Sequence, residues 1–418
     1  MSFVNRKKLK MLAAAIYEKM PYLKNADSLF PENEMKGKKY GMAVHAYLAD
    51  PGTVKDGLIA SPDKIHEVEV SSFMKNKNTS VEWDLWDELE NIEDFKKEIV
   101  DVKAGKLARE VQLSVLKENV FRSCQASASA TAGFGLLTDS SSKLDELAID
   151  GDLVTFLRPT LHGKIAEGGL SKFIPSEKMK EIYEDKYLGQ YSGSAQVELA
   201  GMPVLDTTGV DAAPTMTFDV VKDASNNIIG LKPSETITGS GTGSIIVGVP
   251  YVVEGLKIVD ESGIETEQDY VLIVNKETRF DAEGNASEVV YVPQIRITAQ
   301  GKGYGNPNAW MTGAALTTLA DGGTTVTLTL GLMDGISAGK RYDIGQCRTI
   351  KALSFDQYRF NDLPAAKTEN TSTFENITLK CQSGPNIVNG VAVMRIDMPY
   401  VAKVFEVRKS VTLYIERT

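Results

Sequence analysis

The sequence predicts an α+β protein organised around one long helix. Residues 91–125 contain no proline, and apolar residues recur there three or four positions apart, which places them on one face of a helix. Residues before this stretch look extended or arm-like, whereas most residues after it have strand-like patterns. A helix of this length would span about 50 Å, well beyond the usual length of about a dozen residues. We therefore expect a spine laid across a sheet.

Local signals support this helix. Asn91 suits the N-cap, and Glu93 and Asp94 follow where the helix dipole favours negative charge. Gly105 interrupts the helix at a cost of about 1 kcal/mol relative to alanine, so we expect any bend to occur there. The apolar positions are Ile92, Phe95, Ile99, Val102, Leu107, Ala108, Val111 and Val115.

Residues 1–36 are expected to form an arm. Residues 3–19 are basic and amphipathic, and Pro21 ends the helical pattern. A lone amphipathic helix has no core of its own, so we expect it to dock on another part of the chain or on another chain. Its apolar side comprises Leu9, Leu12, Ala13, Ile16 and Met20.

Residues 37–80 predict two strands joined by a long solvated loop. Residues 42–48 and 68–72 alternate as strands do, and the connection ADPGTVKDGLIASPD contains two prolines and two glycines. This pattern is typical of a projecting hairpin. An apolar link that contains Trp83 and Trp86 then leads into the long helix.

Beyond the long helix, residues 127–135 are mostly small, which allows either close backbone approach or a mobile loop. An α/β pattern follows between residues 140 and 206. It comprises a helix near 144–147, a buried strand at Leu153–Leu157 closed by Pro159, a charged helix at 175–187 and the start of a strand at 201–205.

Residues 214–332 form a β-rich block. Strand-like runs such as TMTFDVV, YVLIVN and TTVTLTL alternate with turn clusters such as DASNN and DAEGNAS. That spacing indicates an antiparallel barrel or sandwich, and the block could be an insertion. Residues 333–418 return to mixed character and end in two strand-like segments, Val391–Val401 and Val404–Ile415, long enough to lie beside the helix.

Composition excludes some classes of protein. The 418 residues are 42% hydrophobic, enough for two or three cores, and 56 acidic against 46 basic side chains give a net charge of −10. This balance argues against a dedicated nucleic-acid binder, although not against a surface that faces nucleic acid. The odd number of cysteines predicts reduced, buried thiols. No run is long enough to span a membrane, and the apolar run at 11–16 is too short for a signal peptide, so we expect no export.

No catalytic, cofactor-binding or metal-binding residue is predicted. His45, His66 and His162 lie in different predicted elements, so surface or loop positions are expected. The glycine-rich stretches 239–243 and 335–340 lack the spacing of phosphate loops, and the calcium-like stretch 281–285 lacks the later ligands, so all three predict turns.

Carboxylates gather before and at the start of the long helix. They either complement the helix dipole on a solvated face, or contact the basic residues 6–10 in the arm of a neighbouring copy. The cluster consists of Asp84, Asp87, Glu88, Glu90, Glu93 and Asp94.

The order of these parts resembles the major capsid protein of tailed phages, the Hong Kong 97 fold. The stretches that carry the resemblance are Ile92–Arg122, Leu153–Ala166, Gly201–Leu205 and Val391–Val407. The β-rich block lies where coat proteins of the Salmonella podovirus (P-twenty-two-like) lineage carry an inserted barrel. Its TMTFDVVKDASNN and VVYVPQIRI are similar to the opening and later strands of that insertion.

The resemblance implies a division into six segments. They are an N-terminal arm (1–36), an extended hairpin loop (37–80), a peripheral domain with the spine helix (81–130), an axial domain (131–213), an inserted antiparallel β-barrel (214–332) and a return through the axial and peripheral domains (333–418). Lys55 and Lys64 lie in the hairpin, but no asparagine and glutamate that would complete the covalent cross-link of some family members can be identified.

The resemblance further implies a structural protein of a tailed double-stranded DNA bacteriophage. Hexamers and pentamers of the chain would build an icosahedral procapsid with a scaffolding protein and a portal protein. It would mature around packaged DNA that is held without specific recognition. The chain would be a virion component assembled in the host bacterial cytoplasm, with no enzymatic activity, cofactor or membrane. Arm, hairpin and spine would bury apolar area against neighbouring copies, and Gly105 would let the spine bend between shell states.

Three other functions fit parts of the sequence. A phage tail or surface-adhesion protein would use the β-rich block to bind a ligand and would form a fibre or a monomer. A non-viral compartment shell would share the fold. An enzyme built on the α/β segment would need clustered polar residues, which the sequence does not display.

Overall fold

A computed structural model of the chain describes most of the sequence. The described residues are 6–36, 38, 40–48, 68–83, 102–131, 133–170, 190–222, 228–238, 244–274, 278–279, 295–298, 307–311, 323–358, 368–375, 377–386 and 391–417. The chain divides into two compact units. Unit 1 comprises Met1–Ala46, Glu69–Lys117 and Leu353–Lys403, and unit 2 comprises Tyr47–Val68, Glu118–Ala352 and Val404–Thr418.

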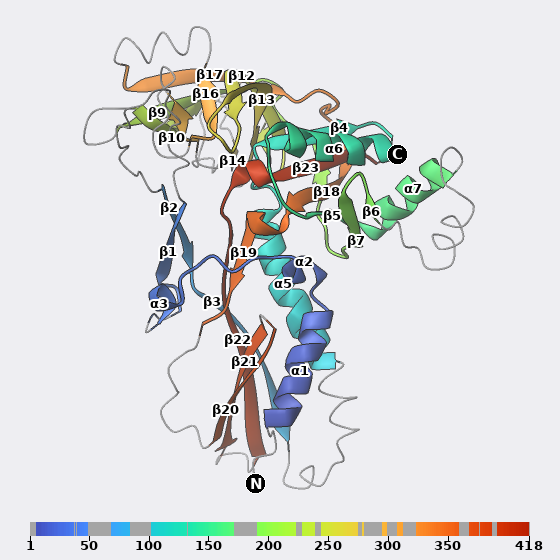
Figure 1. Cartoon of the computed structure of the whole chain (residues 1–418), viewed down its shortest axis with the longest axis vertical. Coiled ribbons are helices and arrows are strands. Elements are labelled where there is room, and N and C mark those ends of the chain that lie inside the picture. The colour runs from blue at the N-terminus through green and yellow to red at the C-terminus, as the bar shows by residue number, and fades with distance from the viewer. Residues whose placement is uncertain are drawn as a thin grey trace, which may run out of the picture. The chain divides into compact units, whose positions relative to one another are not determined.

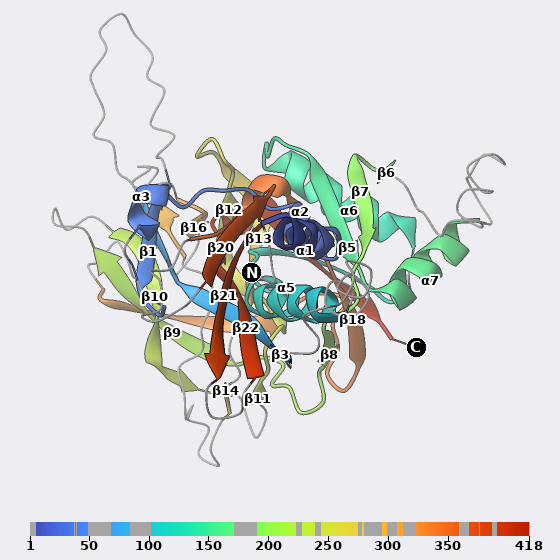
Figure 2. The same cartoon turned by 90° about the horizontal axis from the view of Figure 1, so that it is seen from below.

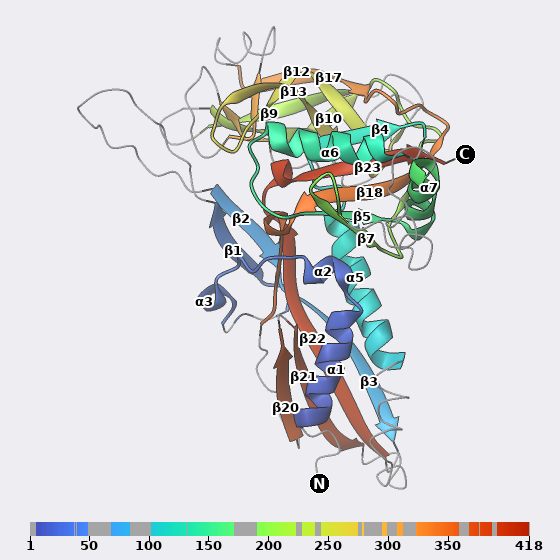
Figure 3. The same ribbon diagram turned by 45° about the vertical axis from the view of Figure 1, so that its right-hand side comes forward.

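Unit 1 is built on a five-stranded sheet with helices on one face (Figures 1 and 3). The strand order is β19 (Leu353–Asp356), β22 (Val391–Val404), β21 (Ile377–Asn386) and β20 (Thr368–Phe374), and β3 (Lys75–Trp83) also pairs with β22. The pairs β20–β21, β21–β22 and β22–β3 are antiparallel. The N-terminal helices of this unit are α1 (Arg6–Glu18), α2 (Pro21–Lys24) and α3 (Glu32–Met35).

Helix α1 confirms the predicted amphipathic arm helix. Its five predicted apolar residues are all buried, and it lies against β20 and β21. The rings of Tyr17 and Phe374 meet edge to face, with centroids 5.8 Å apart. The helix therefore docks on its own chain, and the expectation that it buries its apolar face against a neighbouring copy is wrong. The reason is that β20 and β21 present the apolar surface that the helix needs.

The long helix is described over its C-terminal part as α5 (Gly105–Asn119). Figure 2 shows α5 beside α1, and the backbone N–H of Tyr22 donates to Gln112 Oε1 at 3.0 Å. The predicted apolar face is confirmed from Leu107 to Val115 but is wrong for Val102, which is 62% exposed. Residues 84–101 lie outside the described residues, so the predicted length stays a prediction.

The end of the helix was predicted too late. Helix α5 ends at Asn119, before the predicted end near Gln125, and Gln125 is instead the first residue of strand β4 (Gln125–Ser129), which pairs with β23 (Ser410–Glu416) in parallel. At the other end, a π-helical turn over residues 102–104 precedes Gly105. The helix is thus irregular next to the glycine at which we expected a bend.

The predicted hairpin is present. Strands β1 (Ala43–Leu48) and β2 (Val68–Phe73) form a two-stranded sheet, and the connection 49–67 lies outside the described residues. A single residue, Met74, separates β2 from β3. Trp83, which we expected in an apolar link before the long helix, is instead the last residue of β3.

Unit 2 contains a mixed seven-stranded sheet. Its order is β4, β23, β18 (Arg341–Thr349), β5 (Leu153–Leu157), β7 (Ser194–Glu198) and β6 (Gln190–Tyr191), with β8 (Val204–Asp206) also on β18. Helix α6 (Phe134–Glu146) lies against β4, β23 and β18, as Figure 3 shows, and also contacts α7 (Pro159–Leu170). The strand predicted at Leu153–Leu157 is confirmed, whereas the helix predicted at 175–187 lies outside the described residues.

The small-residue tract takes part in this layer. Its first part is β4, and α6 begins at Phe134, ten residues before the predicted helix. Close backbone approach was therefore the right alternative for residues 127–129. Between β18 and β19 lies a single 3-10 turn, Ile350–Ala352.

The block 214–332 is β-structured, as predicted. Its main sheet has the order β10 (Ile228–Thr238), β9 (Thr215–Lys222), β17 (Thr325–Leu332), β12 (Pro250–Val259), β16 (Ala309–Met311) and β15 (Ile297–Thr298), with β13 (Glu265–Ile273) also on β12. All described pairs are antiparallel except β15–β16. A smaller pair joins β11 (Ser244–Ile245) and β14 (Thr278–Arg279). The N–H of Leu231 in β10 donates to the carbonyl of Ile295, 2.9 Å away, just before β15.

The closing strands differ from their predicted bounds. Strand β22 runs to Val404, and the second strand begins at Ser410, six residues later than expected, after a 3-10 turn at Val407–Lys409. The turn breaks the predicted strand because the Glu406 carboxylate accepts the N–H of Arg408 and caps it.

We expect Leu12→Ala to destabilise unit 1. Leu12 is buried beneath α1, and truncation of a buried leucine leaves a cavity that typically costs about 2–5 kcal/mol. Urea unfolding of the purified chain measures the change. Lys10→Ala, on the exposed side of the same helix, is the control and should leave the midpoint nearly unchanged. Equal midpoints for both variants would show that α1 is not held by its apolar side.

Candidate functional site

The turn between β22 and β23 includes two charged residues that are buried. Glu406 precedes the turn and Arg408 lies within it, and both side chains are buried, with residue exposures of 4% and 1%. Burial of a charge is costly unless the group is paired and hydrogen-bonded. The partners of these two residues therefore identify the segments to which the turn is attached.

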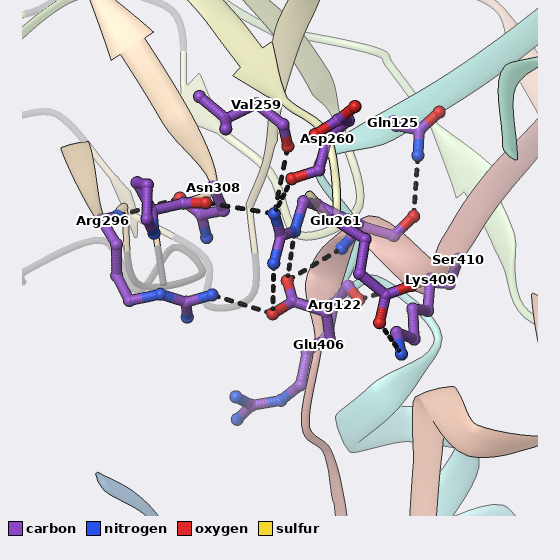
Figure 4. Close-up of polar contacts among 12 residues, drawn as sticks. Arg122, Gln125, Val259, Asp260, Glu261, Arg296, Asn308, Glu406, Lys409 and Ser410 are labelled. Carbon is purple, nitrogen blue, oxygen red and sulfur yellow. Dashed lines mark hydrogen bonds and ion pairs between the residues drawn. The ribbon is translucent and has the colours of Figure 1, made fainter. Parts of the chain in front are cut away.

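Arg408 uses its whole guanidinium group (Figure 4). Its Nε and Nη2 donate to the two carboxylate oxygens of Glu406, each at 3.1 Å. Its Nη1 donates to three backbone carbonyls: those of Val259 at 3.2 Å, Pro307 at 3.1 Å and Asp260. Val259 ends β12 and Pro307 precedes β16, so one side chain joins the turn to two separate segments of the β-rich block.

A second arginine completes the cluster from that block. Arg296 Nη2 donates to Glu406 Oε2 at 2.8 Å, and Arg296 is itself buried. Its backbone is fixed reciprocally by Asn308, because Arg296 N–H donates to Asn308 Oδ1 at 2.9 Å and Asn308 N–H donates to the Arg296 carbonyl at 3.0 Å. The cluster thus holds two positive charges around one carboxylate.

The charges within the cluster stabilise the ionised forms of Glu406 and Arg408. Burial alone would raise the pKa of the Glu406 carboxyl, but the charges of Arg408 and Arg296 and the hydrogen bonds from Arg408 outweigh it and lower the pKa to about 2. Burial would likewise lower the pKa of Arg408, and Glu406 raises it instead. A carboxylate with so low a pKa is a weak base. The contacts of the cluster join the turn to the β-rich block, and we call this arrangement the junction.

Further contacts extend the junction. Lys409 Nζ lies 2.5 Å from the Glu261 carboxylate, and Gln125 Nε2 donates to the Arg408 carbonyl at 2.8 Å. The N–H of Val271 in β13 donates to the Cys124 carbonyl at 2.9 Å. Strand β4, the turn before β23 and the β-rich block are therefore tied to one another by polar contacts at several points.

Gly248 adds a packing constraint to the same junction. Its φ is +89°, and a Cβ there would lie 2.6 Å from the ring of Phe121, so any side chain would clash. The Tyr414 hydroxyl, from β23, donates to the Gly248 carbonyl at 2.7 Å. The backbone of the β-rich block at Gly248 thus packs directly against the ring of Phe121.

The structure places two of the three histidines. His45 in β1 pairs with Glu69 in β2 on the surface, as expected, and His66 lies outside the described residues. The prediction of a surface or loop position is wrong for His162, which is 3% exposed on α7. Its Nδ1–H donates to Glu198 Oε1 at 2.8 Å, which satisfies the buried ring.

Of the other sequence candidates, the structure describes one glycine-rich stretch. Gly335 and Gly339 lie in turns with φ of +85° and +78°, as predicted. Residues 239–243, 281–285 and 84–94, together with Lys55 and Lys64, lie outside the described residues. Among the described residues, no group of His, Cys, Asp and Glu could hold a metal ion.

The three cysteines are free and buried. Burial raises the pKa of each thiol, so the thiolate form is disfavoured and the groups are poor nucleophiles. Within the described part of the chain, we find no helix with the length and apolar character needed to cross a membrane.

Sequence reasoning missed the charge cluster. The signal was available in FEVRKSVTLYI, where Glu406 and Arg408 interrupt an apolar run two residues apart. Such a pair needs buried partners, but Arg296 lies more than a hundred residues away, so no local pattern identifies it.

Comparisons with known proteins give matches among structures alone. No protein-family model and no curated protein matches the sequence. The chain is similar over 94% of its length to a structure from Mycobacterium phage Che8, of which 90% is covered, at 10% identity and a TM-score of 0.43. It is similar over 94% to the capsid structure of cyanophage P-SCSP1u, of which 87% is covered, at 8% identity and a TM-score of 0.42.

A third similar structure is the asymmetric unit of the mature capsid of bacteriophage PhiM1. The match covers 93% of this chain and 87% of that one, at 8% identity and a TM-score of 0.40. The structural neighbours thus include phage capsid proteins. With TM-scores below 0.5, the function proposed below rests on the arrangement of the chain itself.

We expect Glu406→Gln to destabilise the protein by about 3–5 kcal/mol, because it leaves two buried guanidinium groups without a counter-charge. Urea unfolding measures the loss. Glu416→Gln is the matched control: Glu416 pairs with Lys340 at the surface, and its loss should be much smaller. Similar losses in the two variants would contradict a special role for the cluster.

Replacement of Glu406, Arg408 and Arg296 together distinguishes the ion pairs of the cluster from the hydrogen bonds that Arg408 donates to backbone carbonyls. If the cluster were only an ion triad, Glu406→Leu with Arg408→Met and Arg296→Met would restore most of the stability. Arg408 also satisfies three backbone carbonyls, so we expect the triple variant to stay clearly less stable than the wild type.

We expect stability to fall on mild acidification because of His162. Burial lowers the pKa of this imidazole below its ordinary value of 6.5, although Glu198 opposes the shift. The unfolded chain then takes up a proton more readily than the folded chain. The contribution of neutral His162 is present at neutral pH and is lost as the pH falls below about 6.5. Urea midpoints of the wild type and His162→Gln between pH 5 and 7.5 test this, and an identical pH dependence would contradict it.

Proposed function

We propose that this chain is the major capsid protein of a tailed double-stranded DNA bacteriophage, with the Hong Kong 97 fold, and that its copies build an icosahedral shell. The order of its parts carries the proposal. An arm helix (α1), a hairpin (β1–β2) and a helix on a sheet (α5) precede an α/β layer and a β-rich block, and β22 then returns to the first sheet. The six-segment division of the sequence is part of this proposal.

We infer that the β-rich block is an inserted antiparallel β-barrel of the kind found in the P-twenty-two-like lineage. Strands β8 and β18 are antiparallel neighbours, with Asp206 opposite Arg341, so the chain leaves and re-enters the same sheet at one place. Thr207 Oγ1 donates to the Lys340 carbonyl at 2.9 Å, which pins the exit to the return. A domain whose ends lie together is well suited to insertion. The contact of Leu231 with Ile295 brings the two end strands of the block together and supports a closed barrel.

Other copies of the chain are the proposed main partners. The hairpin and its base expose large apolar side chains, which commonly mark protein interfaces. Tyr47 is 58% exposed and Phe73 is 60% exposed, and both belong to the hairpin strands. In a shell of hexamers and pentamers, these side chains would be covered by a neighbouring copy. They differ in this from the apolar side of α1, which is buried.

The remaining partners follow from this role. A scaffolding protein would guide assembly and a portal protein would occupy one vertex. The net charge of −10 suits a wall that encloses DNA without binding it tightly. We propose a virion location after assembly in the host bacterial cytoplasm. The proposal assigns the chain no catalytic step and no cofactor.

We expect the full chain to form closed particles of uniform diameter, alone or when co-expressed with the genes that flank its own. Negative-stain microscopy and sedimentation velocity measure this. Tyr47→Asp with Phe73→Asp should reduce particle yield at least about tenfold, because a charge at a buried contact is costly. Ile264→Asp, at an exposed apolar residue outside the hairpin, is the control. Fibres, or a chain that stays monomeric under both conditions, would overturn the proposal.

A further inference from the structure

The segment that follows α2 crosses β19 without regular secondary structure of its own. Asp27 forms a single parallel bridge with Ser354. In this bridge Asp27 N–H donates to the Leu353 carbonyl at 2.9 Å, and Phe355 N–H donates to the Asp27 carbonyl at 2.9 Å. We refer to residues 25–30 as the strap, since they connect α2 with α3 and, through it, with the hairpin.

One carboxylate outside the strap receives hydrogen bonds from three consecutive strap residues, Ser28, Leu29 and Phe30. Asp356, at the end of β19, is buried and accepts four donors. The backbone N–H of Phe30 donates to its Oδ2 at 3.1 Å, and the N–H of Leu29 is shared between this oxygen, at 3.3 Å, and Ser354 Oγ, at 3.1 Å. The hydroxyls of Ser28 and Ser354 also donate to it. Hydrogen bonds to an ionised acceptor are stronger than neutral ones, so this side chain makes the principal polar attachment of the strap.

The strap differs from its neighbours in what holds it. Helices α1 and α2 are anchored by apolar burial, including Ile16, Tyr22 and Leu23. In the strap, Ser28 and Leu29 are exposed, and Phe30 is its one large buried side chain. Loss of one carboxylate would therefore weaken the strap and leave the helical attachment intact, because apolar burial does not depend on that charge.

We propose that Asp356 is a latch, and that residues 25–30 form a releasable strap whose attachment it controls independently of α1 and α2. The latch fixes the chain that leads to β1 and so positions the base of the hairpin. Its consequence for assembly rests on the proposed function, since only in a shell would the base of the hairpin face another copy. The latch itself is a property of the single chain.

Hydrogen exchange of the unassembled full chain tests the latch directly, because two of the exchanging amides are its donors. In Asp356→Asn, the amides of Leu29 and Phe30 should exchange at least about tenfold faster, whereas those of α1 should be unchanged. Asp27→Asn is the matched control. It also removes one negative charge, here from the strap itself, but the carboxylate of Asp27 accepts the N–H of the adjacent Ser28. It should leave the exchange of the strap nearly unchanged.

A second readout covers the case in which Asp356→Asn fails to fold. Ser28→Ala with Ser354→Ala removes two of the four donors and keeps the charge, and should accelerate tryptic cleavage after Lys24 several-fold. Unchanged exchange in Asp356→Asn, or equal acceleration in Asp27→Asn, would overturn the latch. So would unchanged cleavage in the serine variant when Asp356→Asn does not fold. Because no assembled particle is needed, these results are distinguishable from a failure to form shells.

Discussion

The fold of unit 2 depends on one buried guanidinium group. Arg408 satisfies three backbone carbonyls of the β-rich block while it is held by Glu406, two residues before it. Those carbonyls come from the end of β12 and the approach to β16, segments far apart in sequence. Without Arg408 each of them would lose a donor in the protein interior, which is costly, although the Asp260 carbonyl would keep the N–H of Gly263 at 3.2 Å. The turn before β23 therefore completes the block, and the block in turn supplies Arg296 to complete the turn.

This reciprocity explains how the long β-rich block is held against the mixed sheet. The entry and exit of the block are pinned where β8 meets β18, through Asp206 and Arg341. The block is then held a second time through the Arg408 cluster and a third time where Gly248 meets Phe121. Two short connections alone would allow the block to rotate. Additional attachments remove that freedom, because each involves buried groups that must separate before the block can move.

Unit 1 uses a different balance of forces. Its arm helix is fixed by apolar burial, which is insensitive to charge, and the segment after it is fixed largely by polar contacts to Asp356. The two attachments follow one another along the chain but respond to different perturbations. Apolar burial is non-directional and tolerates small shifts, whereas hydrogen bonds to one carboxylate are lost together when its geometry changes. A chain built in this way can alter the path to its hairpin while its core stays packed.

What the sequence could predict follows from the range of each interaction. The apolar side of α1 and the strand at Leu153–Leu157 depend on neighbours a few residues away, and both are confirmed. The strand β3 was missed because KNKNTS is polar throughout, and only its pairing with β22 makes it a strand. The helix end was misplaced because β23, nearly three hundred residues later, takes residues 125–129 into a sheet.

The charge cluster could be predicted from the sequence even less than the strands could. The apolar residues around Glu406 and Arg408 indicate that two charges will be buried, but they do not identify the partners of those charges. Their partners are carbonyls, which every residue possesses, and one arginine among 46 basic side chains. Backbone acceptors carry no sequence signature, so no pattern could have selected those of Val259, Asp260 and Pro307. A site that recognises the backbone is visible only once the strands are in register, because the strand pairing places those carbonyls within reach of a single side chain.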